Sequence, residues 1–226
     1  PPKEAIREIR VNQNPFSAEF DRVGFGRVEI LTKPGFNKLN GSVNFNFNDA
    51  RLNTRNPFAL NRAPSQMRNF SGFLSGPIKA QRSSYFVDMQ YSQNDNNNVV
   101  NATILDPALN IVSFTQDITI PTRRFSMGTR LDHQLNDSNT LSGRFNFSRF
   151  TSENQGVSGF SLPTRAFDSS GSNYEVSLTE SMIINPKTVN ETRFQFEVRN
   201  SEQNGDNSIP SVNVSNAFIG GGAQAV

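Results

Sequence analysis

Few residues of this chain have the types and spacing that chemistry needs. His133 is the only histidine among 226 residues, and Asp132 precedes it, so a hydrolase triad with one of the many serines is conceivable. Neighbouring residues on a strand point to opposite faces, however, and His133 lies close to a turn at Asn136. We therefore expect His133 at the margin of an apolar surface. We expect no catalytic residues, and we expect that the protein is not an enzyme.

Two other segments contain ligand-like groups. The run Asn94–Asn98, with Asp106 and Asp117 beyond it, carries oxygen ligands suited to Ca²⁺, but its spacing does not match an EF-hand loop. The Gly24-Phe25-Gly26 segment has Glu29 where the dinucleotide fingerprint needs its third glycine, and a strand pattern follows it. We expect a solvated loop and a turn at these places, with no metal and no cofactor.

Composition narrows the remaining classes. Cysteine is absent, which excludes a disulfide scaffold and thiolate metal sites. Arg123-Arg124 and the 20 phenylalanines could suggest stacking on single-stranded nucleic acid. The phenylalanines share their strand faces with valine, leucine and methionine, and the formal net charge is only +2. We therefore expect no nucleic-acid partner.

The elements that must position these residues are β-strands with two unlike faces. Segment Gly41–Asp49 alternates apolar residues with asparagine, which is the period-two pattern of a strand. Short strands are predicted before it at Ile6–Val11 and Arg27–Lys33. Six more are predicted after it: a weak one at Asn69–Gly76, then Ser84–Ser92, Arg124–Leu135, Thr140–Phe150, Asn173–Ile183 and Thr192–Asn200.

The connections between these strands alternate in length. Short turns are expected at Pro77–Ser83, Asn136–Asn139 and Ile184–Asn190. Long polar loops are expected at Arg51–Arg68, Gln93–Arg123 and Thr151–Ser172, the second with a small hairpin of Val99–Leu105 and Asn110–Phe114. Outer-membrane barrels sort their loops in this way, because periplasmic turns are short and extracellular loops are long. The predicted fold class is all-β: an antiparallel transmembrane β-barrel segment of about seven strands.

The barrel interpretation assigns each strand face to a different environment. An arginine facing lipid costs ~2–4 kcal/mol at the membrane midplane, whereas a polar lumen tolerates it. The predicted lumen-facing residues are Asn44, Asn46, Asn48, Asp88, Gln90, Arg130, Asp132, Arg144, Asn146, Arg193, Gln195 and Glu197. The predicted lipid-facing residues are Val43, Phe45, Phe47, Tyr85, Val87, Met89, Phe145, Phe147, Phe194, Phe196 and Val198.

A structural or adhesive surface protein, built as a sandwich or an aggregating sheet, is the alternative. The arrangement of six phenylalanines distinguishes the two hypotheses. A sandwich packs them against a second sheet, whereas a barrel presents them as one outward band on a single sheet. The residues concerned are Phe45, Phe47, Phe145, Phe147, Phe194 and Phe196.

Several segments resemble TonB-dependent outer-membrane receptors, and in particular the Oar-like branch, whose members often carry a carboxypeptidase-regulatory-like domain. The resemblance to the end of the plug domain and the first barrel strand lies in Ala5–Val11, Asn14–Phe20, Gly24–Gly35 and Asn40–Ser42. Looser resemblance to early barrel hairpins lies in Leu74–Ile78, Arg130–Leu135, Asn139–Leu141 and Asn185–Glu191.

The resemblance implies a barrel of about 22 strands closed around a plug. Residues 1–38 are then the C-terminal part of the plug domain, and 39–226 are the N-terminal part of the barrel. We expect an internal fragment, with the signal, TonB box and early plug before Pro1 and further strands after Val226. The implied function is import of an extracellular nutrient across the outer membrane of a Gram-negative bacterium. The implied partners are outer-membrane lipid, the TonB complex and a small-molecule, oligosaccharide or peptide ligand.

Overall fold

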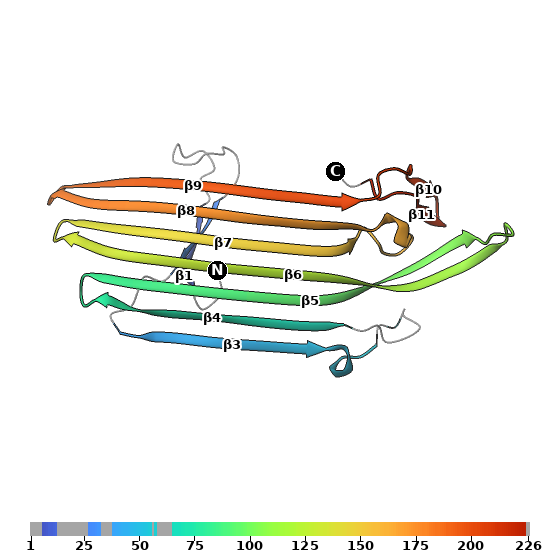
Figure 1. The fold of residues 1–226 in the computed structure, drawn as a ribbon, viewed down its shortest axis with the longest axis horizontal. Coiled ribbons are helices and arrows are strands. Elements are labelled where there is room, and N and C mark those ends of the chain that lie inside the picture. The colour runs from blue at the N-terminus through green and yellow to red at the C-terminus, as the bar shows by residue number, and fades with distance from the viewer. Residues whose placement is uncertain (1–5, 13–26, 33–37, 56, 58–64, 225–226) are drawn as a thin grey trace.

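The protein is an elongated antiparallel meander in the computed structural model, which describes residues 6–12, 27–32, 38–55, 57 and 65–224 (Figure 1). Seven strands pair in sequence order, each with the next. Their bounds are β3 (Asn40–Asp49), β4 (Gln66–Lys79), β5 (Ser83–Leu105), β6 (Ile111–Asn136), β7 (Asn139–Gln155), β8 (Phe167–Asn185) and β9 (Thr188–Gly205).

Two small sheets accompany this seven-stranded sheet. Strands β1 (Ile6–Asn12) and β2 (Arg27–Thr32) form one antiparallel pair, and β10 (Val212–Val214) and β11 (Phe218–Gly220) form the other. Two short 3₁₀ helices lie in the connections, η2 (Ala50–Leu52) and η3 (Pro163–Arg165). Among the described residues, no helix has the length and apolar character needed to cross a membrane.

The predicted alternation of the connections between the two ends of the sheet is confirmed, although the β5–β6 connection is only a turn at residues 106–110. The tight turns β4–β5, β6–β7 and β8–β9 all lie at the left end of the sheet in Figure 1. The connections β3–β4, β5–β6 and β7–β8 lie at the right end. Because consecutive antiparallel strands return to the same end at every second connection, the turn at 136–139 shares an end with the turn at 184–190, as predicted.

The prediction of a long loop at Gln93–Arg123 was wrong. Strands β5 and β6 continue through it, pairing without a break from Ser83↔His133 to Leu105↔Ile111. Only the turn at Asp106–Asn110 interrupts them, so the predicted small hairpin is the tip of a much longer one. Asparagine-rich residues such as Asn96–Asn98 have weak strand propensity, but pairing with β6 satisfies their backbone groups and overrides it.

The other predicted strands of the seven-stranded sheet exist and are longer than expected. Strand β8 begins at Phe167, so Thr151–Ser172 is mostly strand, with its loop confined to residues 156–166. Strand β4 extends from Gln66 to Lys79 instead of Asn69 to Gly76. The outer edges of β3 and β9 carry no neighbouring strand among the described residues. The predictions made for Asn14–Phe20, Gly24–Gly26 and Pro34–Gly35 lie outside the described residues.

Candidate functional site

The seven-stranded sheet has one polar and one apolar face, and the structure separates the predicted residues between them. Cross-strand partners lie on the same face, so the register identifies the members of each face. All of the predicted lumen-facing residues, from Asn44 to Glu197, fall on the polar face. All of the predicted lipid-facing residues, from Val43 to Val198, fall on the apolar face. The contact of each face with lumen or lipid stays a prediction.

The apolar face carries a continuous band across all seven strands. One row of directly paired residues is Val43, Gly72, Met89, Met127, Phe147, Tyr174 and Val198. The Phe147 and Tyr174 rings lie 4.8 Å apart, and Phe125 lies 6.0 Å from Phe147. Four such rows, from that of Phe45 to that of Tyr85, extend about 20 Å along the strands. That height approaches the apolar band of an outer-membrane barrel.

The apolar band is open to its surroundings. Phe45 is 64% exposed and Phe196 is 58% exposed, while Phe145 and Phe147 are half-buried among their cross-strand neighbours. Within the part of the chain that the structure describes, no second sheet packs against this band. The arrangement matches the single-sheet criterion and not the sandwich criterion.

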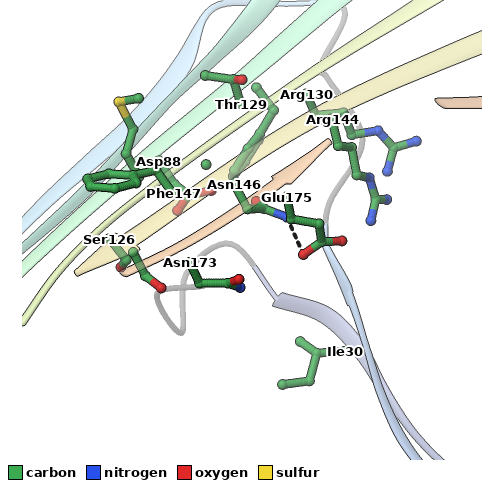
Figure 2. Close-up of a pocket in the computed structure, with 14 residues that line it drawn as sticks. Ile30, Asp88, Ser126, Thr129, Arg130, Arg144, Asn146, Phe147, Asn173 and Glu175 are labelled. Carbon is green, nitrogen blue, oxygen red and sulfur yellow. Dashed lines mark hydrogen bonds between the residues drawn. The ribbon is translucent and has the colours of Figure 1, made fainter. Parts of the chain in front are cut away.

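The polar face holds a network of charged and amide side chains around a hollow of about 330 Å³ (Figure 2). The Arg130 guanidinium donates to both carboxylate oxygens of Asp132, at 2.9 and 2.7 Å, and the Ser142 hydroxyl donates to Asp132 Oδ1 at 2.5 Å. Glu175 accepts from Asn146 at 3.4 Å and from Gln195 at 3.2 Å. Such a surface can hold polar partners without forming an apolar core.

One residue row of the polar face contains the buried Asp88. It runs Ser42, Phe73, Asp88, Gly128, Asn146, Glu175 and Glu197 across the sheet. Phe73 stacks on the buried Phe86 ring with centroids 5.3 Å apart, and Asp88 is only 7% exposed. Gly128 leaves room beside Asp88, because a Cβ there would lie 2.7 Å from Asp88 Oδ1.

The β1–β2 hairpin lies over this polar face. Ile30 of β2 lines the 330 Å³ hollow together with Asp88, Arg144 and Glu175 (Figure 2). A neighbouring hollow is bounded by Arg10 of β1, by β2 and by the polar faces of β6 to β9. A segment that precedes the sheet in the chain therefore covers the polar face and not the apolar one.

The residues considered for hydrolysis do not assemble into a triad. The Ser83 hydroxyl lies 2.7 Å from His133 Nδ1, and both side chains are on the apolar face near the short turns. Asp132 is on the opposite face, where Arg130 and Ser142 bind its carboxylate. The Ser83–His133 pair has the place expected for His133, at the margin of the apolar band.

The carboxylates considered for Ca²⁺ have other contacts or lie apart. Asp95 forms an ion pair with Arg123 at 2.5 Å, at register positions of the apolar face toward the long-loop end. Asp106 accepts from the Asn110 side chain and from the backbone N–H groups of Ala108 and Asn110, at 2.8–3.1 Å. These hydrogen bonds, led by that of the Asn110 side chain, lower the pKa of Asp106. Asp106 therefore holds the hairpin turn.

A small folded cap at the long-loop end was missed by sequence reasoning. Val100, Ala102 and Val157 form a buried cluster, against which Phe114, Leu162 and Phe218 pack, among others. Backbone bonds fix the cap: Asn101 N–H donates to Gly159 at 2.8 Å, and Thr103 N–H donates to Ala217 at 3.1 Å. The alternation of Val100, Ala102 and Ile104 was the available signal, but their partners come from two distant loops.

Together, the single meander, the sorted connections and the exposed apolar band define an outer-membrane β-barrel. Residues 106–225, more than half of the chain, match the family model of the outer membrane beta barrel domain. The chain therefore belongs to the outer membrane beta barrel domain family, and its place is the bacterial outer membrane. No curated protein and no solved structure matched the chain.

Proposed function

We propose that this chain is part of a TonB-dependent transporter of the Oar-like branch, which binds an extracellular nutrient and imports it into the periplasm. The observation that carries the proposal is the β1–β2 hairpin over the polar face, where Ile30 and Arg10 line hollows with the sheet. A plug domain inside a barrel has this placement. The resemblance of Ala5–Val11 and Asn40–Ser42 to the plug end and first strand supports the same assignment.

The proposed mechanism requires a polar wall that holds a plug without fusing to it. The face of β5 to β9 meets this requirement, because arginine, asparagine and carboxylate groups alternate along it and form many weak contacts. The TonB complex, driven by the proton-motive force, pulls on the plug and opens a path along this wall. Transport of this kind needs no covalent chemistry, and we propose a transporter that is not an enzyme. The remaining barrel strands pair with the outer edges of β3 and β9.

Uptake measurements test the proposal. The gene that encodes this chain is deleted, and uptake of candidate nutrients is measured in the intact strain, the deletion strain and a strain without TonB. We expect one nutrient whose uptake falls about equally in both mutants. Uptake that needs the gene but not TonB would contradict energy coupling.

The cap favours a second candidate function, that of a non-transporting adhesive surface protein. Leu109 and Ile111 at its tip are 77% and 78% exposed, as an adhesive contact would require. The same strains discriminate the two functions. An adhesin loses attachment to a surface or a neighbouring cell when the gene is deleted, and it changes no nutrient uptake.

A further inference from the structure

We propose that the 330 Å³ hollow on the polar face binds a cationic nitrogen group, an ammonium or a guanidinium, at the Asp88 carboxylate. Asp88 is more than nine-tenths buried and lines the hollow. Among the described residues, no hydrogen bond or ion pair reaches this carboxylate. A largely buried carboxylate without a hydrogen-bond partner is costly, because it has lost part of its hydration.

The cationic side chains nearest to Asp88 are turned away from it. Arg130 is bound to Asp132, and Arg144 neighbours Arg130 across the strand pair. Figure 2 shows both guanidinium groups at the opposite side of the hollow from Asp88. Neither arginine therefore neutralises Asp88.

Further acceptors surround the same space. Asn173 Oδ1 is buried without a hydrogen-bond partner among the described residues, and Asn173 lines the hollow. Glu175 and the Ser126 hydroxyl also line it. An ammonium or guanidinium carries three to five N–H donors and a positive charge, which matches two carboxylates with an amide oxygen and a hydroxyl.

Gly128 makes the space for this group. A side chain at position 128 would place its Cβ 2.7 Å from Asp88 Oδ1 and 3.2 Å from Asn146 Oδ1. The glycine therefore keeps open the gap between these two acceptors. Ile30 closes the hollow from the side of the β1–β2 hairpin.

The cationic group has two possible sources: a free solute, or a basic side chain from another segment of the same polypeptide. The first source rests on the proposed transport function, and the second does not. Both require the same pairing at Asp88. Binding in detergent solution needs no TonB, so the tests below fail or succeed independently of the uptake experiment.

The first measurement is calorimetric titration of the full polypeptide, purified from outer membranes in detergent. The probe is L-arginine at millimolar concentration, and the control ligand is L-citrulline, which replaces the guanidinium by an uncharged urea group. A free-solute site binds arginine and not citrulline. Asp88→Asn then weakens arginine binding by roughly 30-fold or more, since it removes one partner of a buried charge pair. The matched control Asp137→Asn, at the exposed β6–β7 turn, leaves the affinity unchanged.

The second measurement is the melting temperature of the same variants. If a basic side chain of the polypeptide occupies the hollow, arginine does not bind and Asp88→Asn lowers the melting temperature. If Asp88 is unpartnered, the same substitution removes a buried charge and raises the melting temperature. A raised melting temperature together with no arginine binding overturns the proposal.

Gly128→Ala covers the case in which Asp88→Asn does not fold. The added methyl group fills the gap beside Asp88 and leaves its charge in place. We expect it to weaken arginine binding in the free-solute case and to lower the melting temperature in the side-chain case. A Gly128→Ala protein that keeps wild-type affinity and melting temperature overturns the proposal.

Discussion

The membrane sheet and the cap treat the same kinds of side chain in opposite ways. In the sheet, phenylalanine and valine point outward, and residues such as Phe45 and Phe196 are more than half exposed. In the cap, Val100 and Val157 are 0% and 1% exposed and pack with residues from distant loops. The difference is that only the cap, and not the apolar band of the sheet, buries its apolar side chains against other parts of the described chain. The cap has a core of its own, whereas the predicted environment of the apolar side chains of the sheet is lipid.

The strongest test of this comparison places a charge in the cap core. We expect Val100→Asp to destabilise the cap by on the order of 4 kcal/mol, because it buries an unpaired carboxylate among apolar side chains. Proteolysis of intact cells should then cut within residues 156–166 while the sheet stays protected. The control is Leu109→Asp at the exposed tip, which should leave the rate of proteolysis within residues 156–166 unchanged. Equal effects of both variants would show that the cap has no separate core.

The next test places a charge on the apolar face of the sheet. We expect Phe196→Arg to lower the free energy of unfolding in lipid by about 2–4 kcal/mol, since arginine is costly toward the bilayer midplane. Denaturant titration of the protein refolded into lipid vesicles measures this change. The neighbouring variant Gln195→Arg faces the polar side near Glu175 and should be nearly neutral. If Gln195→Arg lowered the free energy of unfolding more than Phe196→Arg, the assignment of the two faces would be the wrong way round.

A smaller effect is expected where an aromatic ring covers a glycine on the polar face. A Cβ at Gly171 would lie 2.5 Å from Phe150 Cε1 and 2.9 Å from the Asn200 carbonyl oxygen. Gly171→Ala should therefore cost about 1–3 kcal/mol through overpacking, measured in the same denaturant titration. Combining it with Phe150→Leu should recover part of that loss. No recovery would place the strain at the Asn200 backbone instead.

The smallest effect concerns the turn at the hairpin tip. Hydrogen bonds from Asn110 and Ala108 lower the pKa of Asp106, so its ionised form stabilises the turn. This contribution is complete above the ordinary aspartate pKa of about 3.9 and is lost as the pH falls through the lowered value. As the pH falls through this range, the protection of the Ala108 and Asn110 amides against hydrogen exchange, relative to their intrinsic exchange rates, should decrease. Asp106→Asn should abolish that pH dependence, whereas Asp137→Asn should keep it.

The sequence predicted the sheet well where apolar and polar residues alternate. Segments such as Gly41–Asp49 and Thr192–Asn200 were placed correctly because period-two alternation is a local signal. The sequence-based prediction of loops was wrong at Asn96–Asn98 and Ser169–Ser172. Their polar residues are held in strands by pairing with neighbouring strands and not by their own propensity. The two faces were predicted from the same alternation. The enclosure of Asp88 was not, because it depends on Gly128 and on β2, which are remote in sequence.

The order of the strands has a consequence for how the protein is made. Every pairing in the seven-stranded sheet joins strands that are consecutive in the chain. The sheet can therefore grow one hairpin at a time, and each new strand closes only a short loop. Low contact order of this kind favours rapid assembly. A chain halted after any hairpin already has a fully registered sheet, whose last strand presents a ready template for the next one.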